Sequence, residues 1–156
     1  MKRWNKFVVI CLTICMLFAL VGCSFHSNMA YTFDVETGDS IKVKMDTSNG
    51  WKLTTENGAF YVKDENEETI LYGIFIDQED YDLYTSSLLV APNVTVLEES
   101  EANGYEYTMC EIENAELTEI DYVGWIADSN TGVIIASIQS REVTEEAFER
   151  ITLTVQ

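Results

Sequence analysis

The stretch YVGWIADSNTGVIIASI, residues 122–138, decides how this chain folds. It contains two runs, 122–127 and 133–138, in which both odd and even positions are mostly apolar. Successive side chains of a strand point to opposite faces of its sheet, so strands of this kind have to be covered on both faces. The polar segment DSNTG between the runs is typical of a turn. We therefore predict two neighbouring strands joined by a turn and lying between two covering layers.

A third run, ILYGIFI at 70–76, is also apolar on both parities and predicts another doubly covered strand. Gly73 and Gly124 each lie inside one of these runs. A glycine inside a strand marks a bulge or a close approach of backbone. Alternatively, it makes room for an aromatic side chain from a covering helix. The sequence leaves both explanations open.

Segments with alternating apolar and polar residues surround these runs. Residues 31–35 and 41–45 alternate on either side of ETGDS, which predicts a β-hairpin with one buried face. Asn-Gly pairs at 49–50, 57–58 and 103–104 mark further turns. The final ITLTVQ is rich in β-branched residues and predicts a closing strand.

Two segments are candidates for the covering helices. EDYDLYTSSLL, residues 79–89, has tyrosine and leucine near helical spacing, and its acidic start suits the positive end of a helix dipole. A shorter helix is expected over 145–150, with Thr144 as its N-cap. The predicted fold class is therefore α+β: a mainly antiparallel, twisted sheet of about six to eight strands covered by helices on both faces, an α/β/α sandwich.

The N-terminal residues predict export. Three basic residues among the first six precede a largely apolar segment at 7–22, as in a secretory signal. This segment is shorter than the ~20 residues that a bilayer-spanning helix needs. It ends in Leu20-Val21-Gly22-Cys23, which resembles the lipobox of bacterial lipoproteins.

The lipobox resemblance implies how the chain is processed and anchored. In that family a diacylglycerol is joined to the cysteine thiol and the chain is cut before the cysteine. Residues 1–22 would then be the signal peptide, and Cys23 would carry acyl chains such as palmitate. Two acyl chains anchor a protein stably, at ~0.8 kcal/mol per buried methylene. An ordinary cleaved signal and an uncleaved N-terminal helix are the alternatives.

This processing divides the chain into three parts. After the signal peptide, residues 23–30 would form the lipidated cysteine and a short tether. Residues 31–156 would form a single globular domain of ordinary size. The expected location is the extracytoplasmic side of the bacterial membrane.

Several segments of the predicted domain occur in an order known from one family. They are Asn49-Gly50-Trp51, NGYEYTM, YVGWIADSNTGVIIASI and TEEAFERITLTV. This order resembles that of the PsbP family, named for an extrinsic protein of the oxygen-evolving photosystem. The resemblance would cover residues 31–156 and implies the α/β/α sandwich of that family. No functional residue transfers, because the same scaffold serves several functions.

The charge of the chain limits its partners. The whole sequence has a net charge of −18, and removing residues 1–22 takes away three basic and no acidic residues, which leaves −21. Phosphate binding needs clustered Lys and Arg, so we expect no nucleic-acid partner. A negative field attracts cations and repels anionic lipid headgroups. Besides the membrane, reached through the lipid, the expected partner is an envelope protein or a cationic ligand.

Cysteine and histidine are scarce in the expected mature chain. Besides Cys23 it contains only Cys110, so no internal disulfide is expected, and a buried, inert thiol is the simplest interpretation. His26, the only histidine, falls in the tether, which excludes a histidine-based triad on the folded domain. We predict no catalytic residue, no metal ligand and no cofactor.

Two acidic clusters have structural explanations. Residues 64–68 place oxygens at alternate positions, as a calcium loop does, but Thr69 stands where an EF-hand needs glycine. A solvated hairpin loop is therefore favoured. The acidic residues at 77–82 lie where a strand leads into a helix, and helix capping explains them.

Aromatic residues are the remaining functional hint. An exposed aromatic groove beside acids would suit a cationic or sugar ligand, although core packing is the simpler explanation of these aromatic residues. The expected function is a non-catalytic binding or scaffold domain for another envelope component. The alternatives are a low-affinity divalent-cation binder and a small envelope hydrolase that uses paired carboxylates. The aromatic candidates are Trp51, Tyr61, Tyr72, Tyr81, Tyr84 and Trp125.

Overall fold

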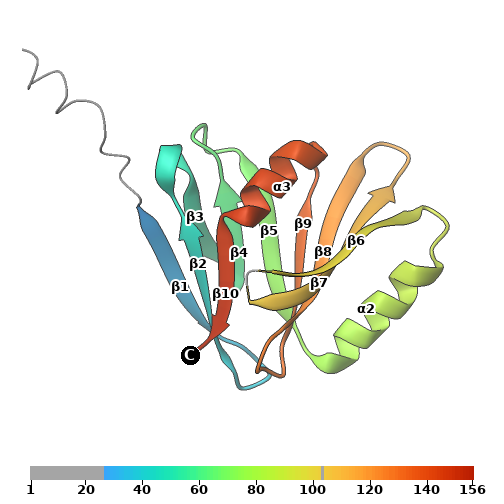
Figure 1. Cartoon of the computed structure of the whole chain (residues 1–156), viewed down its shortest axis with the longest axis horizontal. Coiled ribbons are helices and arrows are strands. Elements are labelled where there is room, and N and C mark those ends of the chain that lie inside the picture. Colours follow the sequence, from blue (N-terminus) through green and yellow to red (C-terminus); the bar gives the residue numbers. More distant parts are fainter. Residues whose placement is uncertain (1–26, 103) are drawn as a thin grey trace, which may run out of the picture.

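A computed structural model describes residues 27–102 and 104–156. In this part of the chain, ten strands, two helices and one 3₁₀ turn are arranged around two sheets (Figure 1). The smaller sheet consists of β1 (Asn28–Asp34), β2 (Ser40–Asp46) and β10 (Ile151–Val155). The larger sheet consists of β3 (Lys52–Glu56), β4 (Ala59–Lys63), β5 (Thr69–Ile76), β6 (Val94–Ala102), β7 (Tyr105–Glu113), β8 (Thr118–Ile126) and β9 (Gly132–Ser137). The helices are α2 (Gln78–Val90) and α3 (Arg141–Glu149), and the 3₁₀ turn is η1 (Ser48–Gly50).

The strands pair in antiparallel fashion in both sheets. The order is β1-β2-β10 in the smaller sheet and β3-β4-β5-β9-β8-β7-β6 in the larger one. The hairpin expected over 31–45 is confirmed, and β2 buries Ile41, Val43 and Met45 at alternate positions. The Asn-Gly turn at 57–58 is confirmed as well. Its two residues have φ values of 51° and 81°, and positive φ at both positions is what a type I′ turn requires.

The two apolar runs of the 122–138 stretch form neighbouring strands in the middle of the larger sheet. β8 pairs with β9, and residues 127–131 connect them. All six residues of β9 are buried, and so are six of the nine residues of β8. Since adjacent side chains point to opposite faces, the prediction that these strands are covered on both faces is confirmed.

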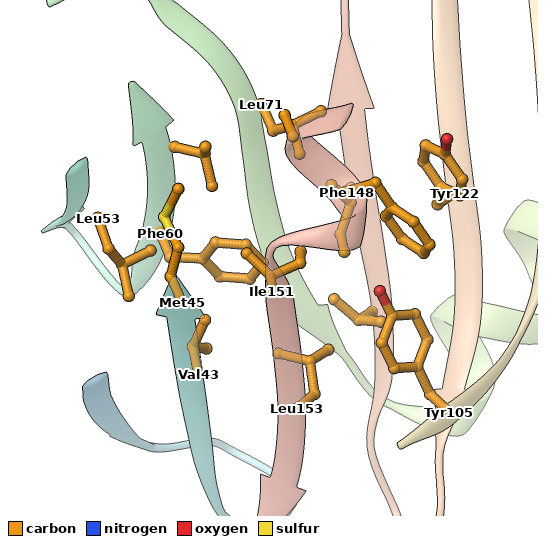
Figure 2. Close-up of a cluster of buried hydrophobic side chains, with 14 of the residues drawn as sticks. Val43, Met45, Leu53, Phe60, Leu71, Tyr105, Tyr122, Phe148, Ile151 and Leu153 are labelled. Atoms are coloured by element: carbon orange, nitrogen blue, oxygen red, sulfur yellow. The ribbon is translucent and has the colours of Figure 1, made fainter. Parts of the chain in front are cut away.

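Different elements cover the two faces of the larger sheet. Tyr122 belongs to the core under β2, β10 and α3, and its ring stacks on that of Phe148 with centroids 3.7 Å apart (Figure 2). Val123, the next residue of β8, points to the opposite face and packs in a cluster with Leu88 of α2. We call the side under the smaller sheet and α3 the first face, and the side under α2 the second face.

The expected α/β/α sandwich is wrong. The described residues form two antiparallel sheets made mostly of strands, and only part of each face is covered by a helix. The closing strand β10 pairs with β2, and their apolar side chains, among them Val43 and Leu153, cover the larger sheet. Alternation indicates that one face of a strand is buried. It does not indicate whether the strand extends a sheet or lies across it in a second sheet.

The run at 70–76 is covered on one face and only partly covered on the other. Leu71 and Gly73 of β5 are buried on the first face. Tyr72 and Ile74, on the second face, are 40% and 37% exposed. The prediction of two covered faces is therefore wrong for this strand. The reason is that α2 packs against β6 and β9 and leaves the outer side of β5 partly open.

Gly73 and Gly124 make room for aromatic side chains. Phe60 of β4 pairs with Gly73, and its ring occupies the position that a Cβ of residue 73 would take. A Cβ at residue 124 would lie 2.7 Å from both the Tyr105 ring and the Glu106 carbonyl oxygen. The rings therefore come from adjacent strands of the same sheet and not from a covering helix.

We expect Gly73→Ala to lower the free energy of unfolding by about 1–3 kcal/mol, because the added methyl group overlaps the Phe60 ring in a packed core. Urea unfolding of the variant and the wild type measures the difference. The double variant Gly73→Ala/Phe60→Leu should lose less than the two single variants added together, since the smaller side chain frees space. Equal stability of Gly73→Ala and wild type would contradict this explanation of the glycine.

The C-terminal helix begins earlier than expected. α3 starts at Arg141, with Ser140 in the N-cap position, so the prediction of Thr144 as the cap is wrong. Thr144 is buried inside the helix, and its hydroxyl forms a 2.9 Å hydrogen bond with Ser137 Oγ of β9. A buried hydroxyl needs such a partner. Thr144 therefore fastens α3 to the larger sheet.

Candidate functional site

A cavity of about 640 Å³ lies at one end of the two sheets, and its volume is typical of small-ligand sites. Three parts of the chain surround it: the end of β1 with the turn that follows, the turn between β3 and β4, and the passage from β5 into α2. In Figure 1 the β1–β2 turn and the passage from β5 into α2 lie along the lower edge of the molecule. We call this cavity the base cleft.

One wall of the base cleft is apolar. Phe33 and Phe75 are half-buried, and their ring centroids are 5.2 Å apart. Val35, Ile74 and Ile76 also line the base cleft. Apolar side chains that remain partly exposed in a hollow offer a ligand surface that can be removed from water.

Four exposed carboxylates also line the base cleft, and no Lys or Arg is among the described residues that line it. Charges of one sign add their fields, and here they add to the negative field of the whole chain. The base cleft therefore favours a cationic group. The carboxylates are those of Asp34, Glu36, Asp77 and Asp80.

The start of α2 holds two of these carboxylates in place. Asp77 is the N-cap residue, and its Oδ1 accepts a 2.9 Å hydrogen bond from the backbone N–H of Asp80. Helix capping is thus confirmed as the structural role of the acidic cluster at 77–82. Glu79 and Asp80 in the first turn offset the positive end of the helix dipole, so this end does not make the base cleft an anion site.

A polar network fixes the turn that closes the base cleft on one side. Asp39 Oδ2 accepts hydrogen bonds from the Thr131 hydroxyl and the Asn130 N–H, both at 2.7 Å. The Thr37 hydroxyl donates a third at 3.3 Å. These bonds, the one from Thr131 above all, hold the pKa of the Asp39 carboxyl below its ordinary value. They fasten the β1–β2 turn to the connection between β8 and β9.

The acidic segment at 64–68 forms the loop between β4 and β5. Asp64 Oδ1 accepts 2.9 Å hydrogen bonds from the backbone N–H groups of Asn66 and Glu68, so this carboxylate turns toward its own loop. The hairpin-loop interpretation of this segment is confirmed. Residues 27–102 and 104–156 contain no group of three or more His, Cys, Asp or Glu side chains that could hold a metal ion.

Asp121 lies outside the base cleft, beneath α2. Its carboxylate is 2% exposed and accepts a hydrogen bond from the Tyr84 hydroxyl, while Oδ1 has no hydrogen-bond partner in the part of the chain that the structure describes. Burial raises the pKa of Asp121 to about 6, against the lowering effect of the Tyr84 bond. Paired-carboxylate hydrolysis needs an acid facing a second carboxylate in an open site. Asp121 is not among the residues that line the base cleft.

Five of the six candidate aromatic residues lie on the second face. Tyr61 and Tyr72 are direct partners across β4 and β5. Tyr81 of α2 contacts Trp125 of β8 edge to face, with centroids 5.1 Å apart. Tyr84 reaches the sheet through its bond to Asp121. Tyr81, Tyr84 and Trp125 therefore serve to pack α2 on the sheet, whereas Tyr72 remains partly exposed.

The other residues singled out in the sequence lie elsewhere. Trp51 packs beside the first-face core, and the Arg150 guanidinium carbon is 4.7 Å from its ring centroid. Cys110 is buried, as predicted, and burial raises the pKa of its thiol to about 11. Leu20, Val21, Gly22, Cys23 and His26 lie outside the described residues.

Sequence reasoning missed much of the base cleft. Phe33 and Asp34 belong to an ordinary alternating strand, and Phe75 belongs to a run that predicts a core strand. The one available signal was indirect. The turn at 36–40 and the acidic passage at 77–80 carry polar residues beside half-buried apolar ones, whereas the turn at 57–58 is followed by the buried Ala59.

Two smaller hollows lie along β6 and β7, with volumes of about 370 and 310 Å³. Carboxylates line both of them, and the smaller hollow is the more open of the two. The larger of the two also places apolar side chains beside carboxylates, but Met109, Tyr122 and Phe148 are already buried there, whereas Phe33 and Phe75 of the base cleft are half-buried. The first is lined by Glu98, Glu145 and Glu149 with Tyr107, Tyr122 and Phe148, and the second by Glu99, Glu101 and Glu106.

No helix within 27–102 and 104–156 is both long enough and apolar enough to cross a membrane. The sequence matches no protein-family model and no curated protein. The function therefore has to be argued from the side chains of the base cleft and from the N-terminal sequence.

Proposed function

We propose that this chain is a non-catalytic binding domain, lipid-anchored on the extracytoplasmic side of the membrane, and that the base cleft holds its ligand. The ligand class is a cationic group on an apolar body, presented by another component of the cell envelope. One observation carries the proposal: a half-buried apolar wall lies beside four carboxylates, and no described Lys or Arg lines the base cleft.

Both parts of such a ligand gain free energy in the base cleft. An apolar body that covers the Phe33 and Phe75 rings gains about 25 cal/mol for each Å² of apolar surface removed from water. A cation is attracted by the carboxylates and by the faces of aromatic rings. Salt screens the attraction between exposed charges. Binding should therefore weaken as the ionic strength rises.

The position of the base cleft suits a domain tethered by its N-terminal end. β1 begins at Asn28, five residues after Cys23, so residues 28–30 of the predicted tether belong to this strand, whereas the base cleft begins at Phe33, near the other end of β1 (Figure 1). A strand rises about 3.3 Å per residue, so roughly 20 Å separate its two ends. With an anchor at Cys23, the base cleft would open away from the membrane and toward other envelope components.

The proposal is tested by titrating the purified protein with a Lys-Lys-Leu peptide amide and measuring Kd by calorimetry or NMR. We expect the double variant Asp77→Asn/Asp80→Asn to bind about five- to tenfold more weakly, because two attractive charges are lost while asparagine still caps α2. Asp82→Asn, on the same helix but outside the lining of the base cleft, is the matched control and should bind like wild type.

A neutral peptide distinguishes the contribution of charge to binding from the contribution of apolar contact. A Gln-Gln-Leu amide should bind more weakly than Lys-Lys-Leu to the wild type, and the two should differ little with the double variant. The double variant removes two charges and Asp82→Asn removes one, so a loss of binding free energy for Asp77→Asn/Asp80→Asn of no more than twice that for Asp82→Asn would mean that only the overall charge of the protein matters. That result, or identical binding of both peptides to wild type, would contradict the base cleft as a cation site.

A further inference from the structure

The outer side of β4 and β5 carries apolar side chains that α2 leaves open. Tyr61 and Tyr72 are direct cross-strand partners, and Ile74 follows on the same face two residues later. Tyr72 is 40% exposed and Ile74 is 37% exposed. Large apolar residues that gather on an exposed face are typical of an interaction surface. We call Tyr61, Tyr72 and Ile74 the β5 strip.

The β5 strip leads directly into the base cleft. Ile74 belongs to both, and β5 continues from it to the acidic side of the cleft at Asp77. From Tyr72 to Asp77 the chain extends over roughly 17 Å. A single ligand of that length would contact the carboxylates of the base cleft at one end and the tyrosine rings at the other.

We propose that the base cleft and the β5 strip together bind one extended peptide segment of an envelope protein. A basic side chain of this segment occupies the base cleft, and alternate apolar side chains lie over the β5 strip. The inference rests on the proposed function, because it takes the base cleft as the site of the cationic group.

The side chains of the β5 strip that lie on one strand have the same spacing as the alternate side chains of an extended peptide. Tyr72 and Ile74 are two residues apart on one strand and point to the same face. An extended peptide also presents every second side chain to one side, at intervals of roughly 6.6 Å. A peptide that runs along β5 can therefore pair its alternate side chains with Tyr72 and Ile74.

Charge selects a basic peptide over the other partners that an apolar surface attracts. A second copy of the chain would bring another net charge of −18 and another set of cleft carboxylates against the same surface. That approach is repulsive, and an anionic lipid surface is repelled for the same reason. A basic segment of about six extended residues fits both the charge and the length of the surface.

Two probes distinguish the β5 strip from the base cleft. The short probe is the Lys-Lys-Leu amide, and the long probe is Lys-Lys-Leu-Ser-Phe-Ser-Leu amide, which adds alternate apolar side chains. With the purified full chain, we expect the long peptide to bind about tenfold more tightly than the short one, because it removes more apolar surface from water. Tyr72→Ser should abolish this gain and leave the Kd of the short peptide unchanged.

Tyr31→Ser is the matched control for this change. Tyr31 is 38% exposed, nearly as much as Tyr72, but it lies on β1 and belongs neither to the base cleft nor to the β5 strip. The control variant should bind both peptides like wild type. Thermal unfolding checks that each variant is folded, and Tyr61→Ser on the neighbouring strand repeats the test should Tyr72→Ser not fold.

The outcomes separate this inference from the proposed function. If both peptides bind equally and only Asp77→Asn/Asp80→Asn weakens them, the base cleft is a cation site and the β5 strip plays no part in it. If neither peptide binds, both proposals are wrong. If Tyr72→Ser instead removes binding of the protein to phosphatidylcholine vesicles, the β5 strip contacts lipid, which overturns the peptide inference.

Discussion

From about pH 7.5 to about pH 4.5, the wild-type protein should gain about 2 kcal/mol in free energy of unfolding relative to its Asp121→Asn variant. Asp121 is 2% exposed beneath α2, where an ionised carboxylate is poorly solvated. This burial raises its pKa to about 6, whereas the pKa of aspartate in an unfolded chain is about 3.9. Urea unfolding of both proteins at the two pH values measures the effect.

The sign follows from which state holds the proton more tightly. Because the pKa of Asp121 is higher in the folded state, the unfolded chain loses this proton first as the pH rises, and its ionisation favours unfolding. Protonated Asp121 therefore makes its full contribution to the free energy of unfolding below about pH 4, and this contribution is lost as the pH rises through about 6. A difference of about two pKa units corresponds to ~3 kcal/mol. The other carboxylates titrate in both proteins and cancel in the comparison.

Tyr84→Phe tests the cause of this pH dependence. The Tyr84 hydroxyl donates a hydrogen bond to Asp121 and lowers the pKa of that carboxyl. Its removal should raise the pKa further, so stability should be lost at a higher pH than in wild type. Glu119→Gln should act in the opposite direction, because the Glu119 carboxylate raises the pKa of Asp121. A pH-independent difference between wild type and Asp121→Asn would contradict the buried-charge explanation.

The centre of the larger sheet could be predicted because its sequence permits few arrangements. Two of the three runs that are apolar on both parities form β8 and β9, which are covered on both faces, whereas the third run, in β5, is partly open on the second face. β6 was not predicted as a strand. A bulge between Val96 and Glu98 shifts its alternation, and most of its side chains are exposed at the edge of the sheet. Its sequence therefore lacks the pattern of a half-buried strand.

The second sheet could not be predicted because strand pairing is not a local property. The sequences of β2 and β10 each indicate one buried face, and both burying faces are found. Which strand each one pairs with depends on segments more than 100 residues apart, since Met45 is the partner of Ile151. The sequence contains only one candidate for a long helix. This indicated that an element other than a long helix covers the first face.

The base cleft was predictable only in part, for a similar reason. Its acidic side at 77–80 was recognised as a cluster, and its capping role was correctly identified. Its apolar side comes from 33–37 and 74–76, which are brought together by the packing of one sheet on the other. No pattern within either segment distinguishes a core phenylalanine from one that lines a cleft.

Cys23→Ser should abolish both acyl labelling of the protein and the cut before residue 23. Only a thiol can form the thioether that the lipobox resemblance implies at Leu20-Val21-Gly22-Cys23. Two acyl chains contribute ~0.8 kcal/mol per buried methylene, so their loss removes the whole anchor of the mature form. Labelling of cells with a palmitate analogue, followed by fractionation and a size comparison, measures both effects.

Cys15→Ser is the matched control, because it makes the same exchange within the apolar segment but outside the lipobox. This variant should be labelled, cut and membrane-bound like wild type. A Cys23→Ser protein that is membrane-bound at the mature size would contradict the lipid anchor and, with it, the orientation of the base cleft away from the membrane. The peptide titrations would still stand in that case, because Asp77, Asp80 and Tyr72 belong to the folded domain and act independently of how the chain is anchored.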